Sequence, residues 1–455
     1  MMQKKTFLIL LLIMALNHVL LASLPRRAFL GTQLNTINDS VASLYALPEA
    51  QGALVERVVE NSSAADMGLQ AGDVIVSLMG QPILRPTDVT SLIGTLRGGD
   101  AVEVGYYRGG KLFFAEAALL PLPHETSPYA EVIYDAVPWD GGYVRTIIRK
   151  PRDEGKFPAL FFIQGAHCGS MDRMNPNDPV ARLIEGFARL GYVVVKTEKA
   201  GVGDSRTTVS CSDCNLEQEV GLFSASFNQL AHYDFVDTSR VFVLGHSMGG
   251  VQAPLLQTDF APRGIAVFGT VVRPWFEYFM EIVRKQRLML GQDYLENERI
   301  AHDALRFFYA LMVEKRSPRE LLQDEQIRDF MLNQWNFDGA ENFHGRHYTF
   351  WQQLQDARLF EAWANTSAHV LSIWGKGEFV ALNPYEHQLI ADIVNHYNPG
   401  KARFVRMPNI NHGFVWVEDV HHAIAVRNNW QYQYSNFNAD IVTLVHDWIQ
   451  EVTAE

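Results

Sequence analysis

The sequence predicts an α/β domain, built on a mostly parallel sheet with helices on both faces, preceded by a small β-rich domain. Two observations point to this class. Apolar, strand-length runs alternate with helical stretches after residue 128, whereas short strands separated by glycine-rich turns fill residues 26–120. A chain of 455 residues is long enough for both. Its 47% apolar and 20% charged residues exclude a disordered, collagen-like or coiled-coil protein.

The first residues predict export rather than a folded element. Two lysines lie in Met1–Lys5, an apolar run begins at Phe7, and the small residues Ala22 and Ser23 follow it. This pattern is typical of a secretory signal peptide, which we place at residues 1–22, and it indicates a periplasmic or extracellular protein. The alternative is an uncleaved anchor in a membrane, although the apolar run is shorter than the roughly 20 residues of a spanning helix.

The chain has three cysteines, too few for a disulfide scaffold. Cys211 and Cys214 lie two residues apart in a polar stretch, and in an oxidising compartment we expect a small loop disulfide between them. Cys168 then remains as a free thiol. A redox-active pair or a zinc site is the weaker alternative, because no strand–helix redox pattern and no neighbouring histidine accompany the pair.

The first domain follows from its strands and turns in order. Residues 52–60 predict a strand, and residues 69–77 predict a turn at Gly72-Asp73 followed by another strand. Residues 85–96 predict a helix with proline and aspartate in its first turn. Glycine pairs at 98–99 and 109–110 bracket a final pair of strands.

These residues resemble a PDZ domain of the type found in HtrA proteases. The most recognisable stretch is Ser63–Ile75, and the family's carboxylate-binding loop corresponds to Phe29, Leu30, Gly31 and Thr32. The resemblance implies that the loop's backbone N–H groups hold the C-terminal carboxylate of a peptide, which pairs with the following strand. The alternative is a domain that serves packing alone.

A proline-containing linker is expected at 121–128, and the α/β domain at 129–455. We expect an amphipathic helix at 179–190. The predicted strands of the α/β domain are 156–163, 192–196, 240–244, 264–268, 369–374 and 402–407.

The chemistry centres on Gly245-His246-Ser247-Met248-Gly249-Gly250, which follows an apolar strand and opens a helical segment. In this setting Gly-x-Ser-x-Gly predicts a nucleophile elbow, a tight turn in which Gly245 and Gly249 leave room and Ser247 projects from the sheet. The N–H of Met248 then lies at a helix start and donates to an oxyanion.

A serine nucleophile requires a base that is oriented by an acid, and in this fold the order along the chain is serine, acid, histidine. His412 follows the last predicted strand and is the expected base, whereas His421 and His422 lie further along the chain. Glu378 follows the strand at 369–374 and is the expected acid. Asp356 and Asp419 are the alternatives.

The second oxyanion donor is expected in the loop that follows Ile163. Here the chain reads Gln164-Gly165-Ala166-His167-Cys168-Gly169. We expect the Ala166 N–H to be the donor, with His167 as the neighbouring alternative. Removing one such donor costs about 3–4 kcal/mol of transition-state stabilisation, so this loop is decisive for activity.

Together, residues 129–455 resemble the α/β-hydrolase superfamily. The supporting segments are Asp237–Gly250, Ala200–Ser205, Trp374–Glu378 and Asn411-His412. The resemblance does not extend through about 272–350, where the superfamily inserts a cap over its active site. This aromatic-rich stretch, with Trp275 and Trp335, is expected to pack the cap.

The resemblance implies a serine hydrolase whose default substrate is a carboxylic ester. A serine peptidase is the first alternative, because the PDZ-like domain could deliver peptide C-termini. An exopeptidase would need cap acids to hold a free amine, and the cap offers Glu277, Glu281, Glu296 and Glu298. A catalytically silent PDZ scaffold is the second alternative.

No cofactor and no metal are predicted, because the sequence has no phosphate loop, dinucleotide fingerprint or His-Glu-x-x-His motif. The net charge of −12 argues against a nucleic-acid partner, which would require a basic face.

Overall fold

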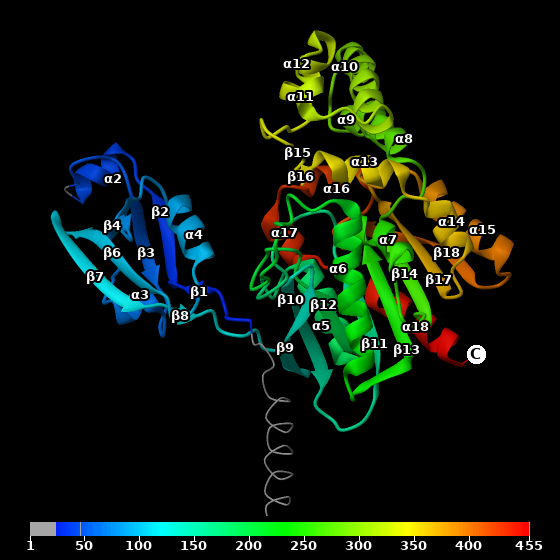
Figure 1. Cartoon of the computed structure of the whole chain (residues 1–455), viewed down its shortest axis with the longest axis horizontal. Helices are drawn as coiled ribbons and strands as arrows, with labels where there is room; N and C mark the ends of the chain where they lie inside the picture. The colour runs from blue at the N-terminus through cyan, green and yellow to red at the C-terminus, as the bar shows by residue number, and fades with distance from the viewer. Residues whose placement is uncertain (1–23, 46, 455) are drawn as a thin grey trace, which may run out of the picture. The chain divides into compact units, whose positions relative to one another are not determined.

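The computed structural model describes residues 24–45 and 47–454, so the predicted signal peptide at 1–22 lies outside the described residues. The chain divides into two compact units (Figure 1), Met1–His124 and Glu125–Glu455. Each unit has its own hydrophobic core. Within the described ranges, every helix is too short or too polar to cross a bilayer.

The first unit is built on an antiparallel sheet. Its strands, in spatial order, are β2 (Thr32–Thr36), β3 (Ala53–Val58), β4 (Val74–Leu78), β6 (Ala101–Arg108) and β7 (Lys111–Ala118). A short strand β5 (Gln81–Pro82) pairs with β4, and β1 (Ala28–Phe29) pairs with β8 (Leu120–Pro121). The helices are α2 (Asp39–Leu44), α3 (Ser63–Asp66) and α4 (Pro86–Thr95). The predicted strands and the predicted helix of this unit are therefore confirmed.

The segment predicted as a linker, residues 121–128, is divided between the two units, and its residues form contacts within the unit to which they belong. Pro121 belongs to β8, and the Leu122 N–H donates to the Arg27 carbonyl oxygen. Glu125 and Ser127 are buried in the second unit. Glu125 forms ion pairs there with Lys196 and Arg149.

The second unit contains an eight-stranded, mostly parallel sheet. In spatial order its strands are β18 (Ala402–Asn411), β17 (His369–Gly377), β14 (Gly264–Phe268), β13 (Val236–His246), β11 (Phe157–Ile163), β12 (Val193–Thr197), β10 (Gly142–Pro151) and β9 (Ala130–Trp139). The strands from β18 to β12 are parallel, and β10 and β9 form an antiparallel hairpin at one edge. All six predicted strands are present. The hairpin was not predicted.

Alternation along the strands creates two apolar faces. In β11, Leu160 and Phe162 face one hydrophobic cluster, whereas Phe161 and Ile163 face the other. The first cluster includes α5 (Pro179–Arg189) and α18 (Asp440–Ala454). The second includes α6 (Leu216–Asn228), α7 (Met248–Gln252) and α15 (Pro384–Tyr397). Helices thus cover both faces of the sheet, and this unit has the α/β-hydrolase fold.

A helical insertion lies between β14 and β17 and occupies the segment predicted as the cap. Its elements are α8 (Trp275–Glu281), α9 (Arg287–Met289), α10 (Tyr294–Phe308), α11 (Pro318–Leu321), α12 (Glu325–Gln334), β15 (Asn342–Phe343), β16 (Arg346–His347), α13 (Tyr348–Asp356) and α14 (Leu359–Ala364). In Figure 1, α8 to α12 form a green-to-yellow layer beyond the sheet. Buried rings pack the layer. Phe279 and Phe308, for example, lie 4.8 and 4.6 Å from the ring of Trp335.

The disulfide differs from the prediction. Cys168 is bonded to Cys211, with a Cα–Cα distance of 5.8 Å, whereas Cys214 is a buried free thiol. The predicted Cys211–Cys214 bridge is therefore wrong, as is the free thiol at Cys168. The Cys214 N–H donates to the Ser210 carbonyl oxygen, and this turn directs Cys214 into the hydrophobic core, while Cys211 lies against the loop that carries Cys168.

Candidate active site

The predicted elbow lies between β13 and α7, as expected. Ser247 has φ 55° and ψ −119°, a conformation that a non-glycine residue rarely adopts. The Ser247 N–H donates to the carbonyl oxygen of Phe268, the last residue of β14, at 2.9 Å. Two neighbouring strands therefore hold the serine at the carboxyl edge of the sheet.

The two elbow glycines are required by close backbone contacts. A β-carbon on Gly245 would lie 2.5 Å from the Gly249 carbonyl oxygen, and one on Gly249 would lie 2.0 Å from the Ile163 carbonyl oxygen. Neither neighbour is a flexible side chain, so neither could move aside. The spacing Gly-x-Ser-x-Gly is thus explained by contacts within the elbow and with β11.

His412 and Glu378 are brought together from different elements. Glu378 follows β17, and His412 follows β18. His412 Nδ1 lies 2.9 and 3.1 Å from the two carboxylate oxygens of Glu378. A carboxylate accepts, so Nδ1 carries a proton, and in the neutral imidazole the lone pair is then on Nε2. The Glu378 side chain is fully buried, and its Oε2 also accepts from the Ala381 N–H at 3.1 Å.

The pair lies close to the elbow. A β-carbon on Gly269, which follows Phe268, would lie 2.7 Å from Glu378 Oε1 and 2.8 Å from His412 Nδ1. His246, the residue before Ser247, contacts the histidine loop directly. Its Nε2 donates to the His412 carbonyl oxygen at 2.8 Å, and the two imidazole rings are 4.9 Å apart. Burial, followed by repulsion from His412, lowers the pKa of His246 to about 3, so this ring stays neutral.

The alternative acids lie elsewhere. Asp356 forms an ion pair with Lys315 at 2.8 Å. Asp419 caps α16 (Val420–Val426) by accepting from the His422 N–H at 2.9 Å, and both His421 and His422 belong to that helix. Of the three predicted acids, only Glu378 contacts His412.

The predicted oxyanion loop passes beside Ser247. A β-carbon on Gly165 would lie 3.3 Å from Ser247 Cβ and 3.6 Å from its Oγ. Met248 is the first residue of α7, and the first N–H groups of a helix have no partner within it. Ala166 and His167 follow Gly165, and the His167 ring accepts from the Gly169 N–H at 3.0 Å. Burial, and then the charge of Lys199, lower the pKa of His167.

Three buried charged residues that were not predicted from the sequence lie next to this loop: Lys199, Glu219 and Arg346. Burial lowers the pKa of Lys199 to about 8, although Glu219 opposes the shift. Burial alone would raise the pKa of Glu219, but Lys199 and Arg346 hold it below its ordinary value. They come from three separate segments, so no local sequence pattern relates them.

The predicted peptide-binding loop lies in the first unit. Gly31 has φ +77°, and its carbonyl oxygen accepts from the Val59 N–H at 2.8 Å. Thr32 begins β2, which in the described part of the chain pairs with β3 alone. Phe29 ends β1, and the Leu30 carbonyl oxygen accepts from the Ala64 N–H at 2.8 Å. The loop therefore precedes a strand at the edge of the sheet, and its binding of a peptide stays a prediction.

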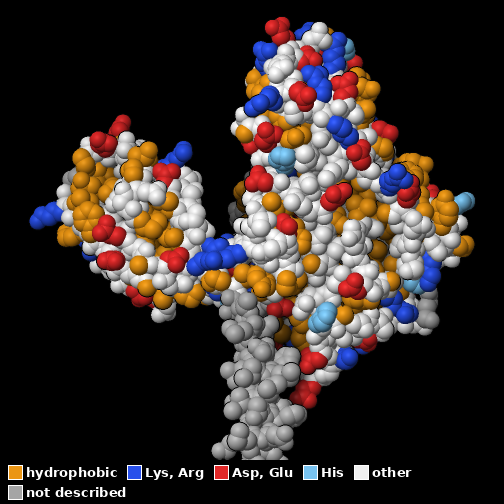
Figure 2. All heavy atoms as spheres, viewed as in Figure 1, with side chains coloured by type: hydrophobic (Ala, Val, Ile, Leu, Met, Phe, Trp, Pro, Cys, Tyr) orange, Lys and Arg blue, Asp and Glu red, His pale blue; other side chains and the backbone are white. Residues whose placement is uncertain are grey.

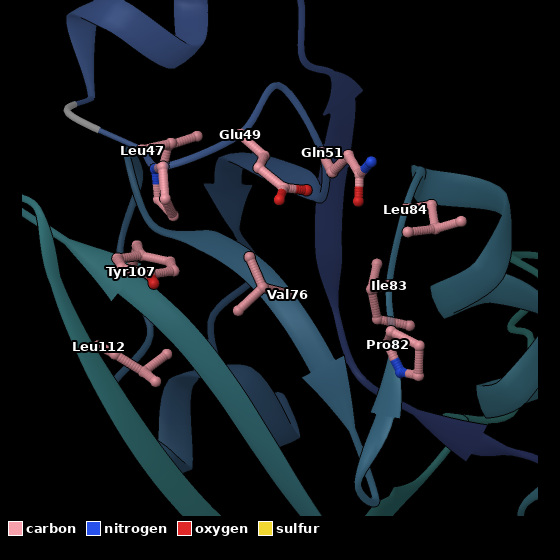
Figure 3. Close-up of a pocket in the computed structure, with 10 residues that line it drawn as sticks. Leu47, Glu49, Gln51, Val76, Pro82, Ile83, Leu84, Tyr107 and Leu112 are labelled. Carbon is pink, nitrogen blue, oxygen red and sulfur yellow. The ribbon is translucent and has the colours of Figure 1, made fainter.

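A separate apolar pocket lies on this unit, with a volume of about 210 Å³. Figure 3 shows Val76 of β4 between Tyr107 on one side and Ile83 and Leu84 on the other. None of the four residues predicted to bind a peptide lines it. Hydrophobic side chains are also visible on the surface of this unit in Figure 2, and the exposed ones include Leu112 and Phe114.

Comparisons with known proteins identify the first unit. The family description "PDZ domain" matches residues 28–119. A protein named "Probable periplasmic serine endoprotease DegP-like" from Pseudomonas putida is 37% identical over 99 residues, which is 22% of this chain and 21% of that protein. The protein of the same name from Rhizobium meliloti is 31% identical over 115 residues, 25% of this chain and 23% of that protein.

The predicted PDZ domain is thereby confirmed. The chain spans only about a fifth of the length of these relatives. Among solved structures, Est1E from Butyrivibrio proteoclasticus covers 71% of this chain and 99% of its own, with 16% identity and a TM-score of 0.42. A thermostable carboxyl esterase from Bacillus coagulans covers 71% and 100%, with 13% identity and a TM-score of 0.42.

Proposed function

We propose that the chain is an exported serine hydrolase that cleaves carboxylic esters through Ser247, His412 and Glu378. One observation carries the proposal: His412 Nδ1 lies within 3.1 Å of both oxygens of the buried Glu378 carboxylate, next to a serine in a strained turn. Such a bond leaves Nε2 ready to accept a proton, which is the role of the base in a serine–histidine–acid triad.

In the first step the Ser247 hydroxyl attacks the ester carbonyl while His412 Nε2 takes its proton. Glu378 holds the ring and stabilises the imidazolium that forms. The N–H groups of Met248 and Ala166 bind the tetrahedral oxyanion. The intermediate then collapses to an acyl-enzyme, and His412 returns the proton to the departing alcohol.

In the second step a water molecule gives a proton to His412 and attacks the acyl-enzyme. A second tetrahedral intermediate forms in the same oxyanion site. Its collapse releases the carboxylic acid and restores the Ser247 hydroxyl, with the proton returned from His412. No redox step and no further reactant are required.

An ester is the preferred substrate class because its leaving group needs the least assistance. A peptide is the alternative, and the PDZ domain favours it, since such domains bind peptide C-termini. The acidic residues of the cap give little support for an exopeptidase, which would need them to bind a free amine. Glu281 is paired with Arg273 and Lys285, and Glu298 is paired with Arg284, so two of the four cap acids are already neutralised.

Export is supported by the apolar segment at the start of the chain and by the word "periplasmic" in the names of the PDZ relatives. In this proposal the loop of Phe29, Leu30, Gly31 and Thr32 holds a peptide carboxylate. The PDZ domain then brings a peptide or a protein partner to the hydrolase.

The test is turnover by the full chain of two matched series, p-nitrophenyl esters of increasing acyl length and aminoacyl or peptidyl p-nitroanilides, with Ser247→Ala alongside. We expect ester hydrolysis that depends on Ser247 and exceeds anilide hydrolysis. A dominant anilide activity would select the peptidase. If the folded wild type and Ser247→Ala are equally inactive on both series, the proposal is overturned, and the catalytically silent PDZ scaffold remains as the alternative.

A further inference from the structure

Two consecutive carbonyl groups of the loop after β11 are held by buried cations. Lys199 Nζ donates to the Gly165 carbonyl oxygen at 2.7 Å, and Arg346 Nη1 donates to the Ala166 carbonyl oxygen at 3.1 Å. The side chains of Lys199 and Arg346 are 0% and 1% exposed. Burying a cation costs free energy unless the cation is paired. Here two buried cations contact the same short loop.

Both cations share one carboxylate. Glu219 in α6, with its side chain 1% exposed, forms ion pairs with Lys199 at 3.0 Å and with Arg346. Its Oε1 also accepts from Gln252 Nε2 at 2.7 Å, and Gln252 ends the short helix α7 that begins with Met248. Glu219 thus connects the loop of Ala166 with the helix of Met248, the two proposed sources of oxyanion donors.

The planarity of the peptide bond links each carbonyl to the next N–H. The described residues contain no cis peptide bond, so each carbonyl points opposite to the N–H of the following residue. Fixing the Gly165 carbonyl toward Lys199 therefore fixes the Ala166 N–H on the other side of that peptide plane. Fixing the Ala166 carbonyl toward Arg346 does the same for the His167 N–H.

We infer that Lys199 and Arg346, joined through Glu219, are positioning residues that aim the backbone N–H groups of Ala166 and His167 at the oxyanion. The inference rests on the proposed function. It also gives the cap a direct role, since Arg346 lies in β16 within the insertion while its contact is to the loop beside Ser247. The cap insertion and the oxyanion loop are therefore mechanically coupled.

The disulfide strengthens this arrangement. Arg346 Nη1 lies 3.6 Å from Cys211 Sγ, and Cys211 is bonded to Cys168, two residues after Ala166. The Arg346 guanidinium also lies over the Phe350 ring, 4.1 Å from its centroid. These contacts fix the guanidinium plane, so the orientation of its donor to Ala166 is set before substrate arrives.

The experiment compares Lys199→Met and Arg346→Met with the wild type in the full chain. Active sites are first titrated with a fluorophosphonate, so that kcat refers to folded, reactive enzyme. We expect kcat on an aryl ester to fall about 10- to 100-fold with little change in KM, because the loss falls on the transition state. The affinity for an aryl trifluoromethyl ketone, which forms an oxyanion adduct with serine, is expected to fall by a similar factor.

Lys196→Met is the matched control. Lys196 lies three residues before Lys199, is equally buried, pairs with Glu125 at 2.8 Å and also donates to a backbone carbonyl, that of Met171. Among the described residues, Lys196 forms no hydrogen bond or ion pair with Ala166 or Glu219. We expect this variant to lose stability while keeping kcat and inhibitor affinity per titrated site. Arg346→Lys, which keeps the charge and one donor, is expected to recover part of the kcat lost in Arg346→Met.

The outcomes separate the two proposals. If the wild type shows no turnover that depends on Ser247, the proposed function falls and the inference falls with it. If the wild type is active but both Met variants match Lys196→Met in kcat and inhibitor affinity per site, the inference alone is overturned. If one Met variant does not fold, the other decides: kcat and inhibitor affinity per site equal to those of Lys196→Met contradict the inference, and a parallel loss of both supports it.

Discussion

At the scale of single residues, the acid that we propose for the site is a glutamate, whose side chain is one methylene longer than that of an aspartate. The longer side chain still reaches His412 Nδ1 with both oxygens, at 2.9 and 3.1 Å, because Glu378 is held by the Ala381 N–H. The elbow serine, the histidine and this acid could all be chosen from the sequence, since each follows a recognisable strand. Lys199, Glu219 and Arg346 could not, because Arg346 and Glu219 are 127 residues apart and meet only in the fold.

Replacing Glu378 tests the assignment of the acid. We expect Glu378→Gln to lower kcat by about 10³- to 10⁴-fold with a small change in KM, because the ring loses its correct tautomer and the charge that stabilises the imidazolium. Asp356→Asn, which alters one of the alternative acids, is the control and is expected to retain wild-type kcat. Steady-state kinetics on an aryl ester decides, and an Asp356→Asn loss larger than that of Glu378→Gln would reverse the assignment.

At the scale of elements, the parallel strands were predictable because their apolar runs are uninterrupted, whereas the β9–β10 hairpin was not. Its strands carry charged residues such as Glu131, Arg145 and Arg149. Both arginines are buried, and their acidic partners, Asp204 and Glu125, lie outside the hairpin. The disulfide was missed for a similar reason. Proximity in the sequence favoured the pairing of Cys211 with Cys214. The fold instead brings together Cys168 and Cys211, which are 43 residues apart.

The Cys168–Cys211 bridge predicts a redox-sensitive activity. Reduction frees the segment after His167, and displacement of a positioned group by about 1 Å costs as much as 100-fold in rate, so we expect kcat to fall about ten- to a hundredfold in dithiothreitol. Cys168→Ser should show the same loss and no further response to the reductant. Cys214→Ser, which removes the buried free thiol, should respond as the wild type does. Undiminished inactivation of Cys168→Ser by dithiothreitol would rule out this bridge as the cause.

At the scale of the whole molecule, two units with separate cores predict separable stabilities. Gly31→Ala places a β-carbon 2.2 Å from Ser62 Cβ at a φ of +77°, so we expect it to destabilise the PDZ unit by about 1–3 kcal/mol. Calorimetry of the full chain should show one transition shifted to lower temperature and the other unmoved, with ester turnover unchanged. Gly94→Ala, in α4 with open space around its β-carbon, is the control and should stabilise the same transition slightly.

The buried charges at the start of the second unit predict its acid sensitivity. Burial alone would raise the pKa of Glu125, but Lys196 and Arg149 hold it below its ordinary value of 4.5. A lowered carboxyl pKa contributes stability that is fully present above the unfolded-state value and is lost as pH falls through the folded-state value. The Tm of this unit in the wild type should therefore decrease as the pH is lowered below about 4.5.

Glu125→Gln separates this effect from general acid denaturation. At neutral pH it should cost about 3 kcal/mol or more, because Lys196 and Arg149 lose a buried partner. Between about pH 6 and pH 3 its Tm should fall less steeply than that of the wild type, because the titrating group is gone. Parallel slopes, measured by thermal unfolding across this range, would show that Glu125 carries no such linkage.

Covalent labelling tests whether Ser247 is a nucleophile activated by its surroundings. The wild-type chain is treated with a fluorophosphonate, digested, and analysed by mass spectrometry, with Ser247→Ala and His412→Ala in parallel. We predict one phosphonate per chain on the peptide that contains Ser247, no label in Ser247→Ala, and strongly slowed labelling in His412→Ala. A folded wild type that stays unlabelled, or that carries its label on another residue, would show that Ser247 is not the activated nucleophile.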